Sequence, residues 1–342
     1  MSDKRKRAER LWCTKEEKQI FKGIQQQANT HNLNLEDVHS GWVKNKDSSL
    51  YFKNPKFNEG NSEVFAKQLV DSLKDHAPSY VTIIREKSKD GHLLVVDPCD
   101  LHVGKLCTVF ETGREYNQQI AVKRCLEGVD GLISKSNGFN IDKVLFIGGN
   151  DILHIDTPNR ATTGGTPQDT SGMWYENFLL AKQLYVDLIE KLSCIADVHF
   201  IFNPSNHDYM SGFFLADVIK THFRNCKNVT FDVSISHRKY FKYGNSLIGT
   251  THGDGAKQTD LGSLMSVECK KDWGVVDFRY FYTHHVHHKS SKDYINVTVE
   301  TMRSPSPADA WHDKKGYVNQ PAIEGFVHSK TQGQVSRLTH YL

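Results

Sequence analysis

The chain is predicted to be an α/β protein with a small helical module at its N-terminus. From residue 92 onward, short apolar and β-branched runs each stop at polar residues, as strands do. Between the early runs, residues 116–136 and 173–195 repeat apolar residues at three- and four-residue spacing, which is typical of helices. This alternation predicts βαβ units and a largely parallel sheet, followed by a half richer in hairpins.

The expected strands share one feature, an apolar run that ends at Asp, Asn, His, Gly or Thr. They lie within residues 92–102, 144–151, 198–208, 240–254, 278–289 and 294–302.

The first 88 residues differ from the rest in the pattern of their apolar and polar residues. Residues 15–33 and 62–76 read as amphipathic helices, separated by a Gly-, Asn- and Ser-rich stretch at residues 41–55. Lys and Arg are frequent here, and three aromatic residues are interleaved with them, which suits a surface for nucleic acid or a partner, or simply a solvated helical face. We expect an accessory module over residues 1–88 and a main domain over residues 89–342.

Composition excludes several classes of protein. Hydrophobic residues make up 38% and charged residues 24% of the 342 residues, and no apolar span reaches the roughly 18 residues that a transmembrane helix needs. The basic N-terminus is not followed by the apolar segment of a secretory signal, so a cytoplasmic location and no membrane association are expected. A net charge of +3 is too small to indicate by itself that the protein binds nucleic acid or any other particular partner. The seven cysteines contain no CxxC pair, which argues against a thiolate metal site or a disulfide framework.

The chemistry is expected where the strands end. In an open α/β sheet, ligands gather at the carboxyl ends of the strands, and oxygen and imidazole donors follow five of the apolar runs. Without thiolate, such donors suit divalent Mn, Fe, Zn, Ni or Mg. Considered alone, a residue of this kind is more often a surface or core residue whose hydrogen bonds are already made than a metal ligand. These donors are Asp100, His102, Asp151, Asn206, His252, His285 and His287.

Their order resembles the calcineurin-like metallophosphoesterase superfamily, whose pattern is DxH, GD, GNH followed by D or E, a lone H, and GHxH. The resemblance spans residues 92–304 and implies a two-sheet αββα sandwich with a catalytic domain that ends in a C-terminal cap segment. The corresponding blocks are Asp100-Leu101-His102, Gly149-Asn150-Asp151, Ser205-Asn206-His207-Asp208, His252-Gly253-Asp254 and His284-His285-Val286-His287.

The chain departs from that pattern at three places. Asn150 is inserted between Gly and Asp, and we choose Asp151 as the bridging ligand, with Asp156 in reserve, because an amide is a poor bridge between two cations. Ser205 and His284 stand where the pattern has Gly. Glycine at such turns usually supplies a positive φ or room for a close approach, so these changes bear on loop geometry more than on metal binding.

The resemblance also implies roles. Asp100, His102 and His287 would hold one metal, Asn206, His252 and His285 a second, and Asp151 would bridge them. The two divalent ions would be Mn²⁺ first, with Mg²⁺, Fe²⁺, Zn²⁺ and Ni²⁺ as alternatives, and a hydroxide bridging them would attack phosphorus.

Beside the ligands, His207 would act as the general acid with Asp208 orienting its ring, unless it merely packs beneath the loop. Asp254 is a candidate partner for a ligand imidazole, and His288 and Lys289 are either phosphate contacts or solvent-facing.

Two further segments are candidates for substrate contact. The Gly-, Pro- and Thr-rich residues 157–169 form either a substrate loop or a plain surface connection. The C-terminal segment mixes aromatic and basic residues, which suits a nucleotide channel or a structural cap equally. The side chains in question are Arg160, Thr162, Thr163 and Gln168 in the first segment, and Arg303, Trp311, Lys314, Lys315 and Tyr317 in the second.

We therefore expect a metal-dependent phosphodiesterase whose substrate is DNA, similar to the DNA repair exonucleases that bacteriophage genomes encode. The sequence lacks a P-loop, a GxGxxG after a strand, a GxSxG elbow and an HExxH helix, which removes the main competing enzyme classes. Three alternatives remain: a phosphomonoesterase, a phosphoprotein phosphatase, and a non-catalytic binding protein in which the metal site has only a structural role. The nuclease resemblance also implies an ATPase partner.

Overall fold

The structure is a computed structural model that describes residues 22–26, 29, 40–44, 49–53, 77–86 and 88–342. The chain divides into two compact units, Met1–His76 and Ala77–Leu342. The predicted boundary after residue 88 is displaced, because the segment before it packs on the second unit. The Tyr80 hydroxyl donates to Glu190 at 2.8 Å, and Arg85 pairs with Asp197 at 2.7 Å.

The described part of the first unit contains a β-hairpin. Strands β1 (Ser40–Lys44) and β2 (Ser49–Lys53) pair antiparallel, with Trp42 opposite Tyr51. The prediction of an irregular stretch between two helices is therefore wrong here: β-forming residues flank a turn-prone Asn-Lys-Asp-Ser sequence, which is a hairpin signal. Residues 22–26 are helical within the first predicted helix, and the second, at residues 62–76, lies outside the described residues.

The second unit is built on a six-stranded sheet of order β13-β12-β3-β4-β5-β6, in which β3 to β6 are parallel. The predicted early strands are confirmed. β12 pairs antiparallel with β3 inside the sheet, so part of the segment predicted as a cap is a sheet strand instead. The strands are β3 (His92–Asp97), β4 (Ile141–Gly149), β5 (Asp197–Asn203), β6 (Val229–Asp232), β12 (Ala322–Ser329) and β13 (Gly333–Tyr341).

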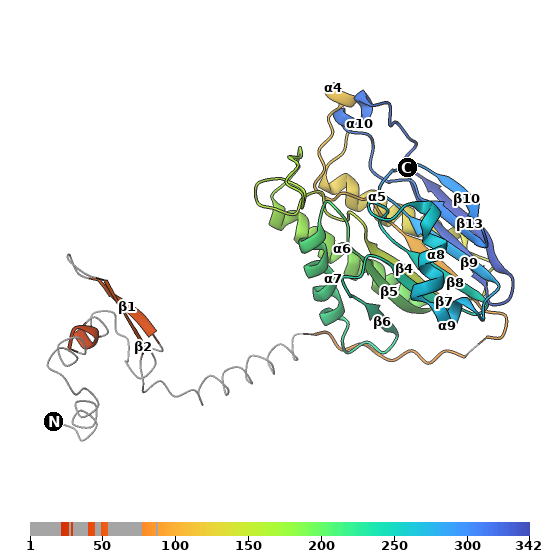
Figure 1. The fold of residues 1–342 in the computed structure, drawn as a ribbon, viewed down its shortest axis with the longest axis horizontal. Helices are drawn as coiled ribbons and strands as arrows, with labels where there is room; N and C mark the ends of the chain where they lie inside the picture. The colour runs from red at the N-terminus through yellow and green to blue at the C-terminus, as the bar shows by residue number, and fades with distance from the viewer. Residues whose placement is uncertain (1–21, 27–28, 30–39, 45–48, 54–76, 87) are drawn as a thin grey trace, which may run out of the picture. The chain divides into compact units, whose positions relative to one another are not determined.

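Three helices, α5 (Gln118–Lys135), α6 (Trp174–Ile195) and α7 (Tyr209–His222), cover one face of this sheet (Figure 1). The first two confirm the predicted helices. Asn117 caps α5 by accepting from the Ile120 amide at 3.0 Å, and Glu176 reaches back to the Met173 amide in α6. Their apolar stripes form one buried cluster with the parallel strands.

The second half of the unit forms a five-stranded sheet of order β10-β11-β9-β8-β7. Hairpins join β7 to β8 and β10 to β11, but the three central strands are parallel to one another. Helices α8 (Leu261–Glu268) and α9 (Lys270–Trp273) follow β8, and α8 packs on the outer face of this sheet. The strands are β7 (Lys239–Tyr243), β8 (Ser246–Thr250), β9 (Phe278–Thr283), β10 (Ser290–Tyr294) and β11 (Val297–Thr301).

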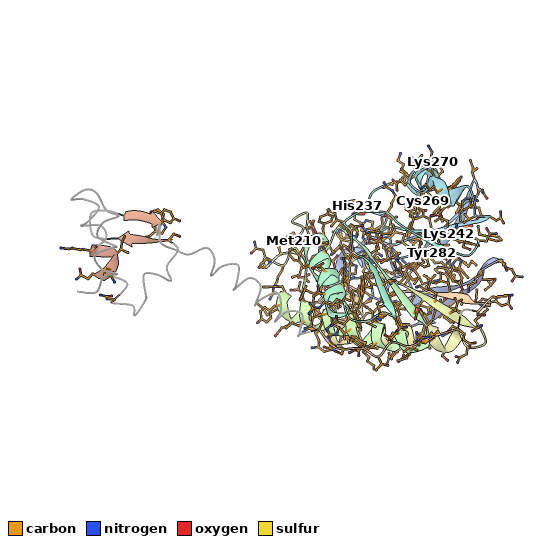
Figure 2. The ribbon with its side chains drawn as sticks, turned by 90° about the horizontal axis from the view of Figure 1, so that it is seen from below. Met210, His237, Lys242, Cys269, Lys270 and Tyr282 are labelled. Atoms are coloured by element: carbon orange, nitrogen blue, oxygen red, sulfur yellow. The ribbon has the colours of Figure 1, made fainter. Side chains whose placement is uncertain are left out.

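The inner faces of the two sheets meet in a second buried cluster that includes Val95, Ile147, Ile248, Tyr282 and Phe326. Tyr282, labelled in Figure 2, is fully buried, and its ring stacks on Phe326 with centroids 4.2 Å apart. Helix, sheet, sheet and helix therefore form successive layers, and the predicted two-sheet αββα sandwich is confirmed. Across the described residues, no helix combines the length and apolarity that crossing a membrane requires.

Candidate metal centre and cleft

The predicted donor side chains lie in loops at the carboxyl ends of five strands from both sheets, β3, β4, β5, β8 and β9. These loops are tied together by backbone hydrogen bonds. The Asp100 amide donates to the Asn150 carbonyl at 2.8 Å, and the His102 amide donates to the Asp151 carbonyl at 2.9 Å. The β3 and β4 loops thus run side by side and present their ligands together.

The backbone of these loops is left-handed at five of the seven proposed donors and at Asn150. Such φ values cost a non-glycine residue of the order of 1 to 3 kcal/mol and persist where the surroundings enforce them, often at functional sites. The residues are Asp100, His102, Asn150, Asp151, His285 and His287, with φ between 49° and 73°.

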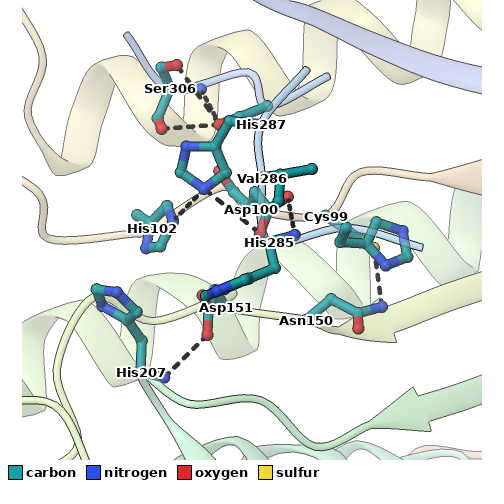
Figure 3. A network of polar contacts seen from close by, with 12 residues as sticks. Cys99, Asp100, His102, Asn150, Asp151, His207, His285, Val286, His287 and Ser306 are labelled. Carbon is teal, nitrogen blue, oxygen red and sulfur yellow. Dashed lines mark hydrogen bonds and ion pairs between the residues drawn. The ribbon is translucent and has the colours of Figure 1, made fainter. Parts of the chain in front are cut away.

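The first donor group consists of Asp100, His102 and His287, whose ligand atoms all lie within 4.8 Å of one another. The Nε2 atoms of His102 and His287 are 3.2 Å apart (Figure 3). Asp100 is fully buried, and its Oδ1 atom accepts no hydrogen bond among the described residues, although Nε2 of His287 lies 3.6 Å from it. An unsatisfied buried carboxylate oxygen is costly, and a cation between these three side chains would satisfy it.

The second donor group consists of Asp151, His252 and His285, again within 4.8 Å. Nε2 of His252 lies 3.2 Å from Oδ2 of Asp151 and 2.9 Å from Oδ1 of Asn206. All four predicted residues therefore face one point. Both groups offer carboxylate and imidazole donors, and the second adds the amide oxygen of Asn206, which fits Mn²⁺, Fe²⁺ or Zn²⁺.

The electrostatics of the second group are those of a site that exchanges protons for cations. Burial lowers the pKa of His252, but the carboxylates of Asp151 and Asp100 outweigh it and raise the pKa to about 9. Burial raises the pKa of Asp151, and the imidazoles of His252 and His207 outweigh that effect and lower it. A proton thus takes the place beside Asp151 that a cation would fill, so metal binding would release it.

His207 lies next to the ligands without belonging to either group's predicted set. Its amide donates to Oδ1 of Asp151 at 3.0 Å, and its Nδ1 lies 2.9 Å from the His154 carbonyl. A carbonyl only accepts, so Nδ1 carries a proton and Nε2 is the ring atom that can gain or lose one. His207 also lines the cleft described below.

The predicted contact between Asp208 and the His207 ring is not formed. Asp208 is buried, with its carboxylate accepting from the Leu153 amide at 2.9 Å and the Ser205 hydroxyl at 2.6 Å. Burial, with the nearby Asp151 charge, raises its pKa to about 7. The His154 carbonyl takes the orienting role, and Asp208 supports the loops beneath the site.

Asp156, the reserve bridging candidate, has a different position. Its carboxylate accepts from the amides of Met210 and Ser211 at 3.1 and 2.7 Å, which satisfies the N-terminus of α7. It belongs to neither donor group, whereas Asp151 does.

The three departures from the resembled pattern have simple structural explanations. Neither Ser205 nor His284 has a positive φ, so neither position needs glycine. The Ser205 hydroxyl accepts from the Asp151 amide at 2.7 Å and so supports the loop that carries it. The inserted Asn150 points away, with its amide nitrogen 3.1 Å from the Cys99 sulfur (Figure 3).

The donor groups open into a cleft of about 680 Å³. Of the proposed substrate residues, Thr162, Gln168, Trp311, Tyr317 and His288 line it. The others do not. Thr163 bonds to Asp156, and Arg303 pairs with Glu324 at 2.8 Å, while Arg160, Lys289, Lys314 and Lys315 are outside the lining.

The cleft lining also contains residues that were not predicted from the sequence, among them Lys105, His154, Asp309 and His312. Nδ1 of His154 is 3.4 Å from Nδ1 of His102, a proposed ligand, and the His154 ring stacks on His207. Lys105 and His154 stand three residues after His102 and Asp151, in the same loops, which is the signal that could have pointed to them. Asp309 and His312 carry no comparable signal.

No protein-family model matches this chain, and the curated proteins give no match. Among solved structures, an archaeal phosphodiesterase overlaps at 10% identity over 73% of this chain and 99% of its own, with a TM-score of 0.33. Vps29 from Entamoeba histolytica complexed with zinc gives 13% identity, 73% and 98% coverage and a TM-score of 0.31. A predicted phosphoesterase from Streptococcus pneumoniae overlaps at 12% identity over 75% of this chain and 99% of its own, with a TM-score of 0.28. The two-sheet sandwich is defined by the order of the strands in each sheet and by the buried cluster between the sheets.

Proposed function

We propose that the chain is a phosphodiesterase of the calcineurin-like metallophosphoesterase type that uses two divalent metal ions and acts on DNA. The observation that carries the proposal is the convergence of two Asp- and His-containing donor groups on one cleft, beside a histidine whose Nε2 is available.

The protein residues divide the work. Asp100, His102 and His287 would hold one cation, and Asn206, His252 and His285 the other, with Asp151 between them. Bound divalent cations neutralise charge on a phosphoryl group and activate water for attack. His207 would donate a proton from Nε2 to the leaving oxygen, since its Nδ1 is held by the His154 carbonyl.

DNA is proposed as the substrate because aromatic side chains line the cleft next to the donor groups, where bases can stack. Manganese remains the first choice of metal. The N-terminal unit is proposed to contact nucleic acid or a partner such as an ATPase, since its sequence combines basic and aromatic residues.

The decisive experiment incubates the protein with end-labelled single- and double-stranded DNA and, separately, with bis(p-nitrophenyl) phosphate. Each substrate is tested with Mn²⁺, Mg²⁺ or EDTA, and Asp151→Asn serves as the inactive control. Metal-dependent DNA cleavage that the variant loses supports a nuclease. Turnover of the small diester alone keeps the phosphodiesterase and rejects DNA. No turnover of any diester with any metal rejects the phosphodiesterase and favours a metal-clipped binding protein.

A further inference from the structure

The segment around helix α10 (Ala310–Lys314) forms a wall of the cleft beside the first donor group. The His312 ring stacks on that of His287, with centroids 5.3 Å apart and planes 14° apart. Trp311 and Tyr317 also line the cleft, yet 56% and 57% of their surfaces are exposed, and their centroids are 5.9 Å apart. Two large aromatic faces thus remain uncovered next to the proposed ligands.

This wall is held in place by buried charge. Asp309 caps α10 by accepting from the His312 amide at 3.0 Å, and its other oxygen lies 3.1 Å from Nζ of Lys105. Lys105 is buried and also donates to the Pro307 carbonyl at 2.9 Å. The aromatic pair is therefore presented by an anchored segment, and ordering it on binding costs little.

The charges of the residues that line the cleft argue against a row of binding sites for successive phosphates of a nucleic-acid backbone. Lys105 is the only Lys or Arg among the described residues that line the cleft, and Asp309 already pairs with it. Glu111 and Asp169 add two carboxylates. Away from the donor groups, the cleft therefore offers little to a second phosphate, while its exposed aromatic faces suit a flat, uncharged group.

We propose that Trp311, with Tyr317 beside it, is a stacking platform for the base of the nucleoside attached to the phosphate at the metal centre. This inference rests on the proposed function, and it specifies the class of substrate that the site would bind. The site takes a nucleotide unit through one phosphate and one base, as at a single-stranded end, and gains little from neighbouring phosphates. A cleft of about 680 Å³ has the size typical of a small-molecule site.

The test measures binding of two ligands to the full chain by calorimetry, in Mn²⁺ and in EDTA. Thymidine 5′-monophosphate carries the base, and 2-deoxyribose 5-phosphate has a hydroxyl group in place of the base, so the ratio of their Kd values reports the contribution of the base. One stacked base is worth about 5- to 150-fold in affinity. We expect a ratio in that range for the unchanged chain, a ratio near one for Trp311→Ala, and an intermediate ratio for Trp311→Phe.

Trp174→Ala is the matched control, because Trp174 is 51% exposed and is not among the residues that line the cleft. Its ratio should equal that of the unchanged chain. An equal Kd for the two ligands in the unchanged chain, or a ratio that survives Trp311→Ala, overturns the platform. Neither result depends on catalysis, whereas absent turnover of bis(p-nitrophenyl) phosphate overturns the proposed function, so the two failures are distinguishable.

Discussion

His284 and Asp97 form a buried pair next to the candidate metal centre, with Nε2 of the imidazole 2.9 and 3.0 Å from the two carboxylate oxygens. Nδ1 of His284 faces the Thr251 carbonyl at 3.2 Å, so both ring nitrogens meet acceptors. Burial lowers the pKa of His284, but Asp97 outweighs it and raises the pKa. The pair joins the loops after β3, β8 and β9, which carry five of the proposed ligands.

Breaking this pair should weaken metal binding although neither residue is a proposed ligand. We expect Asp97→Asn and His284→Gly to lower Mn²⁺ affinity by about 10- to 100-fold, the usual effect of residues that support ligands, as measured by calorimetry. Glu268→Gln is the control, because it breaks an ion pair away from these loops, between the end of α8 and Arg238, which precedes β7. Unchanged Mn²⁺ affinity in both variants would mean that the loops are held by other contacts.

The sequence predicts the part of this site that depends on strand ends. A ligand that follows a parallel strand lies at a known edge of the sheet, so Asp100, Asp151 and His252 could be placed without coordinates. The position of the cleft wall around α10 could not be predicted in this way. The loop that leads into α10 follows a path that depends on buried contacts, such as that between Lys105 and Asp309. β12 was missed for a related reason: the sequence does not say where a late strand inserts.

Asp151→Asn should abolish metal binding and activity together. Its two oxygens separately meet the His207 amide and His252, and the amide that replaces them has no charge with which to hold cations. Metal content by mass spectrometry and turnover of bis(p-nitrophenyl) phosphate measure the two effects. Asp156→Ala is the matched control: it should keep the metal and lose about 0.5 to 2 kcal/mol of stability as a helix cap. Metal loss in the control alone would make Asp156 the bridging residue.

His207→Ala should keep the metal and lose turnover by about 10²- to 10⁴-fold, the usual contribution of a general acid. The hydrogen bond from His207 to Asp151 comes from the backbone amide, which alanine keeps. Metal content and kcat are compared with those of the unchanged chain. A p-nitrophenyl ester has a good leaving group, so the loss should be larger for an alkyl diester. Loss of metal would instead make His207 a ligand.

His328 should make the fold acid-sensitive. It is fully buried in β12 with Nε2 2.7 Å from the Tyr282 hydroxyl, and burial lowers its pKa to about 3. The unfolded chain has a histidine pKa near 6.5 and therefore binds more protons between about pH 3 and 6.5. The free energy of unfolding should fall as pH falls through that range.

Urea denaturation at several pH values measures this slope. His328→Gln has no titrating group, so its slope should be shallower by up to roughly 1.4 kcal/mol per pH unit, the effect of one proton. An identical slope in the variant would assign the acid sensitivity to other residues.

Two deletions should separate the accessory unit from the segment that precedes β3. Removing residues 1–76 should leave the Tm of the second unit and its turnover of small diesters unchanged, because the sandwich has its own clusters of buried residues. Removing residues 1–88 should lower the Tm, since it also deletes Tyr80, which stacks on Phe223 at 5.2 Å, and Arg85, which pairs with Asp197.

DNA affinity provides the second comparison. If the accessory unit captures the substrate, both deletions weaken DNA binding equally, as measured by fluorescence anisotropy, and the shorter deletion does so without a change in Tm. Full DNA affinity after removal of residues 1–76 would rule out substrate capture by that unit. The role of a binding surface for a partner protein would then be the alternative for its basic and aromatic residues.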